Sequence, residues 1–187
     1  MPRAPPTRCR LAGGFRSIGV TAYSASVAKA TGTPATTELT RAGVPHVLHP
    51  SVHDPKAPSY GMEAAAALGI EPARIFKTLL VDADGRLGVG IVPVDRQLDL
   101  KSIAAALGAK RAVMAVPAAA ERATGYVVGG ISPIGQKRRL PTVLDVSALQ
   151  QTSVFVSGGR RGLDVELAPA DLISVTGATV AAIARTG

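Results

Sequence analysis

Lys77 is the residue whose setting in this sequence most clearly predicts chemistry. It lies within residues 75–81, an apolar and β-branched run that predicts a buried strand. Because strand side chains alternate between two faces, Lys77 shares one face with Ile75, Leu79 and Val81. An ammonium against apolar surface is costly unless an anion meets it, and desolvation alone lowers its pKa. We therefore expect a cationic anchor or an unusual base here; the alternative is a lysine whose stem covers apolar surface while its ammonium reaches water.

Two glycine-bearing segments could place main-chain donors around a ligand. The first, residues 125–139, reads GYVVGGISPIGQKRR; its glycines let backbone N–H groups come close to a ligand, and Pro133 stiffens the turn. Such a loop is suited to a carbonyl or a phosphate. The second, residues 157–167, reads SGGRRGLDVEL and predicts two strands joined by a tight turn, with Asp164 facing away from its apolar neighbours. Either segment alone is also compatible with an ordinary turn between strands.

A basic cluster accompanies both glycine-bearing segments. Its members are Lys137, Arg138 and Arg139 at the end of the first, and Arg160 and Arg161 in the second. Lysine and arginine neutralise phosphates, so this cluster is suited to RNA. The alternative is a solvated charged face.

The residues that commonly bind metals or act as nucleophiles do not form a site in this sequence. His46 and His49 on one strand would face opposite sides, and among nearby carboxylates only Asp54 could add to His53. We interpret His49 and His53 as loop or edge residues that hydrogen-bond the fold. The single cysteine, Cys9, cannot form an internal disulfide, which suits a cytoplasmic protein. We expect no metal and no organic cofactor.

Composition predicts one packed domain behind a basic extension. The chain has 187 residues, of which 47% are hydrophobic, and no apolar run approaches the ~20 residues of a membrane span. Residues 1–32 are rich in Pro, Gly, Ser and Thr, and Glu38 is the first carboxylate of the chain. We predict a disordered extension or an upstream translation of the true start for 1–32, the alternative being an organelle transit peptide, and a domain over 33–187.

The remaining pattern predicts short strands and helices without a βαβ rhythm, which favours a mixed α+β sheet. Thr33 is the expected N-cap of a first helix that stops at Gly43. The predicted strands are 44–49, 75–81, 86–92, 113–116, 142–146, 153–157 and 163–167, with a turn at 82–85. The predicted helices are those within 33–43, 59–69, 99–107, 117–123 and 169–175; residues 179–183 fit either strand or helix.

The strand and the two glycine-bearing segments together resemble the YbaK family of free-standing aminoacyl-tRNA deacylases, relatives of the editing domain of bacterial prolyl-tRNA synthetases. The resemblance is carried by FKTL at 76–79, GYVVGGISPIGQK at 125–137 and SGGRRGL at 157–163, and it extends over 33–187. It is closest to the Cys-tRNA(Pro) deacylase branch. It implies the fold of that editing domain, a curved, mostly antiparallel sheet with short helices packed around it.

The resemblance implies a role for individual residues. Lys77 matches the essential lysine that grips the 3′-terminal adenosine and its phosphate. Gly129 and Pro133 match the glycine-x-x-x-proline loop whose main chain holds the aminoacyl ester, and Asp164 matches a functionally important aspartate. Other positions are expected to bind the substrate, namely Ser51, Tyr60, Thr78, Gly130, Ile131, Ser132, Ser157 and Gly158. Many relatives have tyrosine where this chain has Ser51, so the stacking or phenolic hydrogen bond that a tyrosine would supply at that edge is absent.

The resemblance also implies a mechanism without a protein nucleophile. An aminoacyl ester is activated, so its cleavage needs positioning and carbonyl polarisation, and the thiol of a bound cysteine can attack its own ester. We expect an editing enzyme that cleaves Cys-tRNA(Pro), with Cys-tRNA(Cys) as a further substrate and prolyl-tRNA synthetase as a candidate partner. Ser51 motivates a second hypothesis, a preference for Ala-tRNA(Pro) or another misacylated tRNA. The basic surface motivates a third, a non-catalytic module that binds tRNA or a synthetase.

Overall fold

The computed structural model describes residues 32–52 and 60–186. All of them lie in the second of the two compact units into which the chain divides, residues 31–187. Apart from Gly32, the predicted extension lies outside the described residues. The helices are α1 (Pro34–Arg41), α2 (Tyr60–Leu68), α3 (Leu100–Ala106), α4 (Pro117–Thr124) and α5 (Pro169–Thr176), with 3₁₀ turns η1 (Pro72–Arg74) and η2 (Val146–Gln150).

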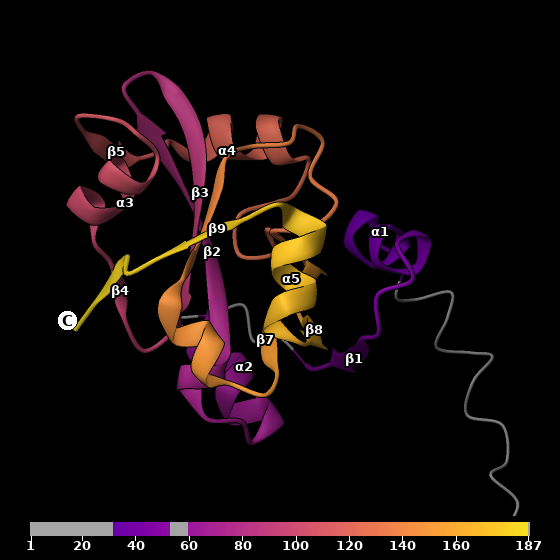
Figure 1. The fold of residues 1–187 in the computed structure, drawn as a ribbon. Helices are drawn as coiled ribbons and strands as arrows, with labels where there is room; N and C mark the ends of the chain where they lie inside the picture. Colours follow the sequence, from indigo (N-terminus) through magenta and orange to yellow (C-terminus); the bar gives the residue numbers. More distant parts are fainter. Residues whose placement is uncertain (1–31, 53–59, 187) are drawn as a thin grey trace, which may run out of the picture. The chain divides into compact units, whose positions relative to one another are not determined.

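Eight strands form one mixed sheet in the order β1-β8-β7-β2-β3-β6-β9, and β5 pairs with β2 outside this order (Figure 1). Within the described ranges, five of the eight strand pairings are antiparallel; β2/β7, β3/β6 and β6/β9 are parallel. The predicted fold class, a mixed and mostly antiparallel sheet with short helices around it, is confirmed. The strands are β1 (Val47–Pro50), β2 (Ile75–Ala83), β3 (Arg86–Pro93), β4 (Gln97–Leu98), β5 (Ala112–Met114), β6 (Thr142–Asp145), β7 (Val154–Arg160), β8 (Leu163–Leu167), β9 (Thr179–Ala181) and β10 (Ala184–Arg185).

The helices bury apolar side chains on both faces of the sheet. On one face Leu39 of α1, Ala120 of α4 and Leu172 of α5 pack in the largest core with the β2 residues Phe76 and Leu80. The other face carries two smaller cores, one under α3 and one under α2. Since alternate residues of β2 enter opposite cores, this strand is apolar on both sides, as the run at 75–81 predicts.

Local sequence signals fix several boundaries. The Thr33 side chain accepts a hydrogen bond from the Thr36 backbone in a capping box, so the predicted N-cap is confirmed. Between β2 and β3 the backbone turns at Asp84 and Gly85, whose φ angles of 50° and 83° suit a two-residue hairpin turn. The predicted turn at 82–85 is therefore too long, because Asp82 and Ala83 still pair in the strand.

The start of β1 differs from the sequence prediction. The strand predicted from residue 44 begins at Val47, because the Val44 amide donates to the Leu39 carbonyl and completes the C-terminus of α1. Residues 179–183, which fit either strand or helix in the sequence, contain the strand β9. Strands β4 and β10 were not predicted, because they pair with each other over two residues each and are too short to show a period.

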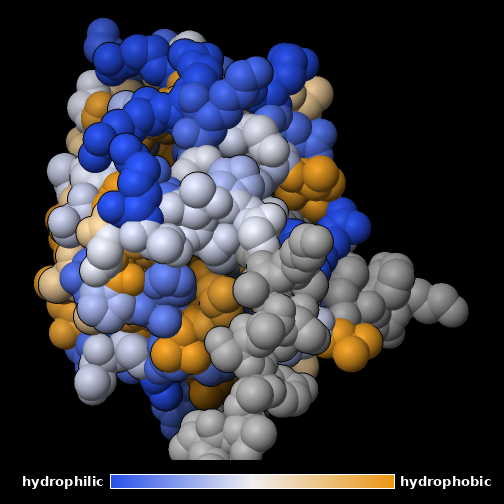
Figure 2. All heavy atoms as spheres, turned by 90° about the vertical axis from the view of Figure 1, so that its right-hand side faces the viewer, coloured by the Kyte–Doolittle hydropathy of each residue, from blue (hydrophilic) through white to orange (hydrophobic). Residues whose placement is uncertain are grey.

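Figure 2 shows the side of the molecule on which α1 and β1 lie in Figure 1. Hydrophilic side chains cover the upper part of this side, and apolar side chains form smaller separate patches below. None of the helices in the described part of the chain is long and apolar enough to cross a membrane.

Candidate functional site

The main cavity opens where the central strand β2 lacks a neighbour. On one edge β3 pairs with residues 76–83. On the other edge β7 pairs only with residues 75–76, and β5 only with residues 81–83. No strand within residues 32–52 and 60–186 pairs with residues 77–80 there, and a cavity of about 430 Å³ lies beside them. This volume is typical of small-molecule sites. The Leu80 carbonyl accepts from the Ala115 amide at 3.0 Å, so the strand main chain that the gap leaves available to a ligand is that before Leu80.

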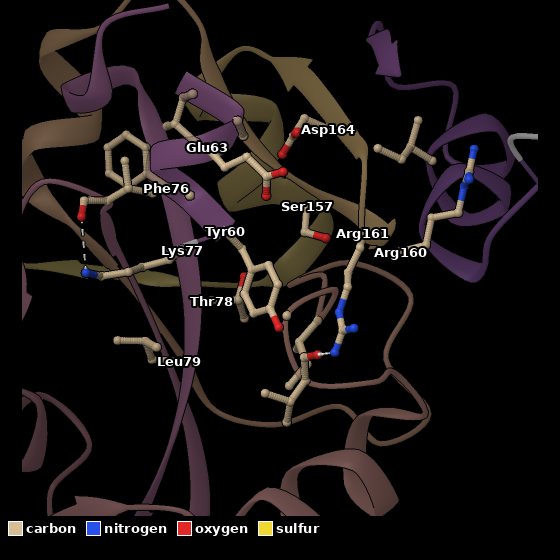
Figure 3. A pocket seen from close by; sticks show the side chains of 18 of the residues that line it. Tyr60, Glu63, Phe76, Lys77, Thr78, Leu79, Ser157, Arg160, Arg161 and Asp164 are labelled. Atoms are coloured by element: carbon tan, nitrogen blue, oxygen red, sulfur yellow. Dashed lines mark hydrogen bonds between the residues drawn. The ribbon is translucent and has the colours of Figure 1, made fainter. Parts of the chain in front are cut away.

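The cavity is closed by four other parts of the fold, namely α2, the β5–α4 connection, the loop at 128–131 and the β7–β8 turn. Because the gap interrupts the sheet, Lys77 and Thr78 both line it although they project from opposite faces of β2. Figure 3 shows the side chains of Tyr60, Ser157 and Asp164 around this space. The elements that carry the family resemblance therefore meet at one site.

Lys77 is half-buried in the cavity wall. Its ammonium donates to the Val94 carbonyl at 3.3 Å, and in Figure 3 its side chain extends away from Tyr60 and Arg161. Burial lowers the pKa of Lys77, and the charge of Asp95 partly opposes this effect. The lysine thus lines the same cavity as Gly129, with its ammonium on a single main-chain acceptor that an anionic ligand could replace.

Asp164 presents a buried carboxyl group to the cavity. It lies on β8, paired with His49 of β1 on one side and with Ser157 of β7 on the other, and is 9% exposed. Burial raises the pKa of Asp164 to about 6, while the charge of His49 acts in the opposite direction. A carboxyl group in this setting is ionised at neutral pH but incompletely solvated, so a cation in the cavity would be strongly favoured.

Thr78 contributes a polar atom that lacks a partner. Among the side-chain nitrogen and oxygen atoms of the described residues that are completely shielded from solvent, its Oγ1 alone makes no hydrogen bond. A buried hydroxyl without a partner costs about 1–3 kcal/mol. Because Thr78 lines the cavity, a polar group of a bound ligand is the natural partner of this hydroxyl.

Gly129 brings its loop close to α2 and to the β7–β8 turn. Its φ angle is +90°, and a Cβ atom there would lie 2.7 Å from the Tyr60 ring and 2.9 Å from Arg161 Nε. Arg161 stacks over the Tyr60 ring at 5.0 Å and donates to the Val128 carbonyl at 2.7 Å. The neighbouring Gly130 lies against the Arg160 backbone, where a Cβ would be 2.9 Å from its Cα. Glycine at both positions is therefore required by close packing.

The other predicted site residues divide between the cavity and positions outside its lining. Ser51, Ile131, Arg160 and Arg161 line it with the residues above. Ser132 is fully buried, and its hydroxyl accepts from the Ile134 amide. The Gly158 carbonyl accepts from the Thr33 hydroxyl at 2.6 Å. The predicted residues that do not line the cavity are Gly130, Ser132, Pro133, Lys137, Arg138, Arg139 and Gly158.

Pro133 and Arg139 instead line a second, smaller hollow of about 160 Å³, together with Glu38. Lys137, Arg138 and Arg139 lie apart from the cavity wall, and all three are exposed, which leaves them available to a phosphate backbone. Gly130, Ser132 and Gly158 support the loops around the cavity rather than face it. Their packing explains why these loops carry such a specific sequence.

Several cavity residues were not predicted from the sequence. Glu63 enters from α2, and Met114, Ala115 and Pro117 enter from the β5–α4 connection. No local pattern marks these residues: Glu63 reaches the site through the packing of α2 against β2, and the other three through the pairing of β5 with the far end of β2. In the described part of the chain, no group of three histidine, cysteine, aspartate or glutamate side chains could hold a metal ion.

Comparisons with known proteins agree with this geometry. The family of the aminoacyl-tRNA editing domain matches residues 54–175. Over 121 residues the chain is 44% identical to EbsC of Enterococcus faecalis, which bears the provisional name Cys-tRNA(Pro)/Cys-tRNA(Cys) deacylase; the match covers 64% of this chain and 73% of EbsC. The proline–tRNA ligase of Geobacter sulfurreducens is 33% identical over 140 residues, which are 75% of this chain but only 23% of the ligase.

Solved structures show the same fold. A crystal structure described as a provisional trans-editing enzyme for prolyl-tRNA synthetase superposes with a TM-score of 0.70 at 26% identity, covering 81% of this chain and 95% of the other. A crystal structure of a hypothetical protein gives a TM-score of 0.73 at 28% identity, covering 82% of this chain and all of the other.

Proposed function

The chain belongs to the aminoacyl-tRNA editing domain family and is an aminoacyl-tRNA deacylase, and we propose that it acts in trans on Cys-tRNA(Pro), with Cys-tRNA(Cys) as a further substrate. The observation that carries this proposal is the gap beside β2. There a lysine, a buried carboxyl group, an unpartnered hydroxyl and a glycine loop line a single cavity. These groups match the charges and the polar atoms at the end of an aminoacyl-tRNA.

Lys77 is proposed to bind a phosphate at the 3′ end of the tRNA. Its ammonium would exchange the Val94 carbonyl for a phosphate oxygen, which restores the charge pairing that burial denies it. The basic residues Lys137, Arg138 and Arg139 are proposed to contact the acceptor stem outside the cavity. Mutating all three to alanine should weaken tRNA binding and flatten its salt dependence, without changing the cleavage rate at saturating substrate.

Asp164 is proposed to hold the α-ammonium of the aminoacyl group. Its carboxylate is buried beside Ser157 and lines the cavity, and a bound ammonium would compensate its incomplete solvation. An N-acetylated Cys-tRNA(Pro) lacks that positive charge, so it should be cleaved at least ~10-fold more slowly than the free amine. Equal rates for the two substrates would contradict this assignment.

Main-chain groups and the Thr78 hydroxyl are proposed to polarise the ester carbonyl. With the ester fixed there, the thiolate sulfur of the substrate attacks its own carbonyl carbon, and the bond to the ribose oxygen breaks. The ribose oxygen takes up the proton lost by the thiol, and cysteine leaves as a cyclic thiolactone. The step needs no protein nucleophile, metal or redox partner.

The direct test is release of labelled cysteine from Cys-tRNA(Pro). Lys77→Ala should lose at least ~100-fold in kcat/KM, whereas Lys101→Ala, which removes an exposed lysine of α3, should retain wild-type activity. Wild-type rates in Lys77→Ala would refute the role of Lys77. Tight binding of charged tRNA without any ester cleavage by the wild type would instead support the non-catalytic alternative.

A second substrate hypothesis has its own observation. Ser51 lines the cavity where many relatives carry tyrosine, which leaves room at that edge. We propose a comparison of Ala-tRNA(Pro) and Cys-tRNA(Pro), in wild type and Ser51→Tyr. Faster cleavage of Ala-tRNA(Pro) than of Cys-tRNA(Pro) by the wild type would make Ala-tRNA(Pro) the preferred substrate. The same assay with added prolyl-tRNA synthetase tests whether this enzyme supplies the discrimination between tRNAs.

A further inference from the structure

His49 lies directly behind the carboxyl group of the cavity. It sits on the edge strand β1, paired across the strands with Asp164 of β8. Side chains at directly opposed positions of antiparallel strands lie on the same face, with Cβ atoms about 4.5–5.5 Å apart. His49 does not line the cavity, so it reaches any substrate only through Asp164.

The ring of His49 is held in place by several groups. Its Nε2 lies 2.9 Å from Oε2 of Glu166, and the ring packs against Phe155 at 5.0 Å between centroids. The other carboxylate oxygen of Glu166 accepts from the Ser153 hydroxyl at 2.5 Å and from Arg74 at 3.3 Å. Arg74 in turn stacks over Phe155 at 5.2 Å. These side-chain contacts add to the strand pairing and hold the ring of His49 in one orientation.

The carboxylate that orients the ring is kept ionised. The Ser153 hydrogen bond, followed by the interactions with His49 and Arg74, holds the pKa of Glu166 below its usual range against a weaker effect of burial. An ionised Glu166 accepts from Nε2 of His49 and so fixes the orientation of the ring.

We infer that His49 is a positioning residue for the proposed deacylation, held by Glu166 so that its positive charge lies beside the Asp164 carboxylate. The inference deepens the proposed function and rests on it. In physical terms, the charge of His49 lowers the pKa of Asp164, whereas burial raises it. Without His49, a larger fraction of Asp164 would be protonated near pH 6 and unable to hold a substrate ammonium.

Other charged groups around Asp164 do not replace His49. The ammonium of Lys77 donates instead to the Val94 carbonyl. Arg161 is engaged by Val128 and Tyr60. The charged residues that line the cavity with Asp164 or lie beside it on β1 and β8 are Glu63, Lys77, Arg160, Arg161, His49 and Glu166. Of these, His49 is the group whose charge lowers the pKa of Asp164.

The experiment separates charge from hydrogen bonding. His49→Gln retains a donor toward Glu166 but loses the charge, and His49→Lys retains a charge without the ring. His46→Gln is the matched control, because His46 precedes β1 and its ring bonds the Val44 carbonyl at 2.8 Å. The pKa of Asp164 is read from its carboxyl ¹³C resonance in each full-length variant, and cleavage of Cys-tRNA(Pro) is followed at pH 6 and pH 8.

In His49→Gln the pKa of Asp164 should rise by about 1, the lower end of the effect of a neighbouring opposite charge. The ionised fraction at pH 6 then falls about 5-fold, and the cleavage rate should fall with it, while the rate at pH 8 changes less than about 2-fold. His49→Lys and His46→Gln should keep the wild-type pKa. Thermal melting of each variant verifies that it is folded.

Three outcomes would overturn the inference. The first is an unmoved pKa of Asp164 in His49→Gln, and the second is an equal shift in His46→Gln. The third is a loss of rate in His49→Gln that is the same at pH 6 and pH 8, which a purely structural role would produce. A wild-type protein without deacylase activity would refute the proposed function and the positioning role together. If the wild type is active but the pKa of Asp164 does not change in His49→Gln, only the positioning role is refuted.

Discussion

Replacing Asp164 with asparagine should make the folded protein more stable at neutral pH while it abolishes the binding of the substrate ammonium. The folded state holds the carboxyl group of Asp164 in a buried position where no described residue donates a hydrogen bond to it, and burial raises its pKa from 3.8 to about 6. A raised pKa of an acid means that the folded state binds the proton more tightly than the unfolded state does. The stability of the wild type therefore falls as the pH rises from about 4 to about 6.

The size of this effect follows from the difference between the two pKa values. A difference of about 2.2 corresponds to about 3 kcal/mol, and because Asp164 is 9% exposed, solvent screening reduces this figure only modestly. The asparagine side chain cannot ionise, so the pH-dependent loss disappears in the variant. The free energy of unfolding of Asp164→Asn relative to wild type should accordingly increase by about 2–3 kcal/mol between pH 4 and pH 7.5.

Urea unfolding at the two pH values measures this difference, and Asp145→Asn is the matched control. Asp145 is also buried, at 3% exposure, but its carboxylate accepts hydrogen bonds from the amides of Ser147, Ile183 and Ala184. These donors keep the pKa of Asp145 below its usual value although burial opposes them, so Asp145→Asn should destabilise the protein at pH 7.5. Stability of Asp164→Asn that tracks wild type at both pH values would show that Asp164 is not a desolvated carboxyl, and the reasoning about its role would fail.

Two further substitutions test other parts of the cavity. Thr78→Val removes a buried hydroxyl that has no partner in the described structure, so it should raise the free energy of unfolding by about 1 kcal/mol in urea titrations yet lower kcat/KM about 10-fold. A loss of stability would mean that the hydroxyl is satisfied within the fold. Gly129→Ala should destabilise by about 1–3 kcal/mol and lower activity, because it combines a strained φ with contact against Tyr60. Gly85→Ala is the control, because Gly85 has a φ of +83° and its added Cβ would meet nothing within 4 Å. This variant should be destabilised by backbone strain alone and should keep its activity. Equal losses of activity in the two variants would contradict the proposed role of the loop that contains Gly129.

Much of the fold follows from signals that act within one element. Thr33 and Gly43 bound α1, and the pair Asp84–Gly85 closes the hairpin, because each depends on backbone geometry that the sequence encodes locally. The start of β1 was predicted three residues early, since the amide of Val44 is already used by the C-terminus of α1. The two-residue strands β4 and β10 exist only through their mutual pairing, which no periodicity within either segment could reveal.

The candidate site was predictable to the extent that its residues carry chemistry of their own. Lys77 on an apolar strand and Asp164 facing away from its neighbours were recognised from alternation, and both line the cavity. The direction of the Lys77 ammonium was not predictable, because it depends on the carbonyl of Val94 across the hairpin. His49 was interpreted as an edge residue that hydrogen-bonds the fold, and its bond to Glu166 agrees with that interpretation.

The gap beside β2 could not be predicted from the sequence. Residues 77–80 form an uninterrupted strand, and nothing in them indicates that one edge lacks a partner. The gap arises because β7 leaves β2 after Phe76 and β5 joins it only at Val81, and both events depend on segments distant in the chain. A strand edge exposed to solvent invites aggregation, whereas one enclosed by α2, α4 and two glycine loops is protected from other strands and open only to a ligand that fits. The same enclosure explains why Lys77 and Thr78, on opposite faces of β2, line one cavity.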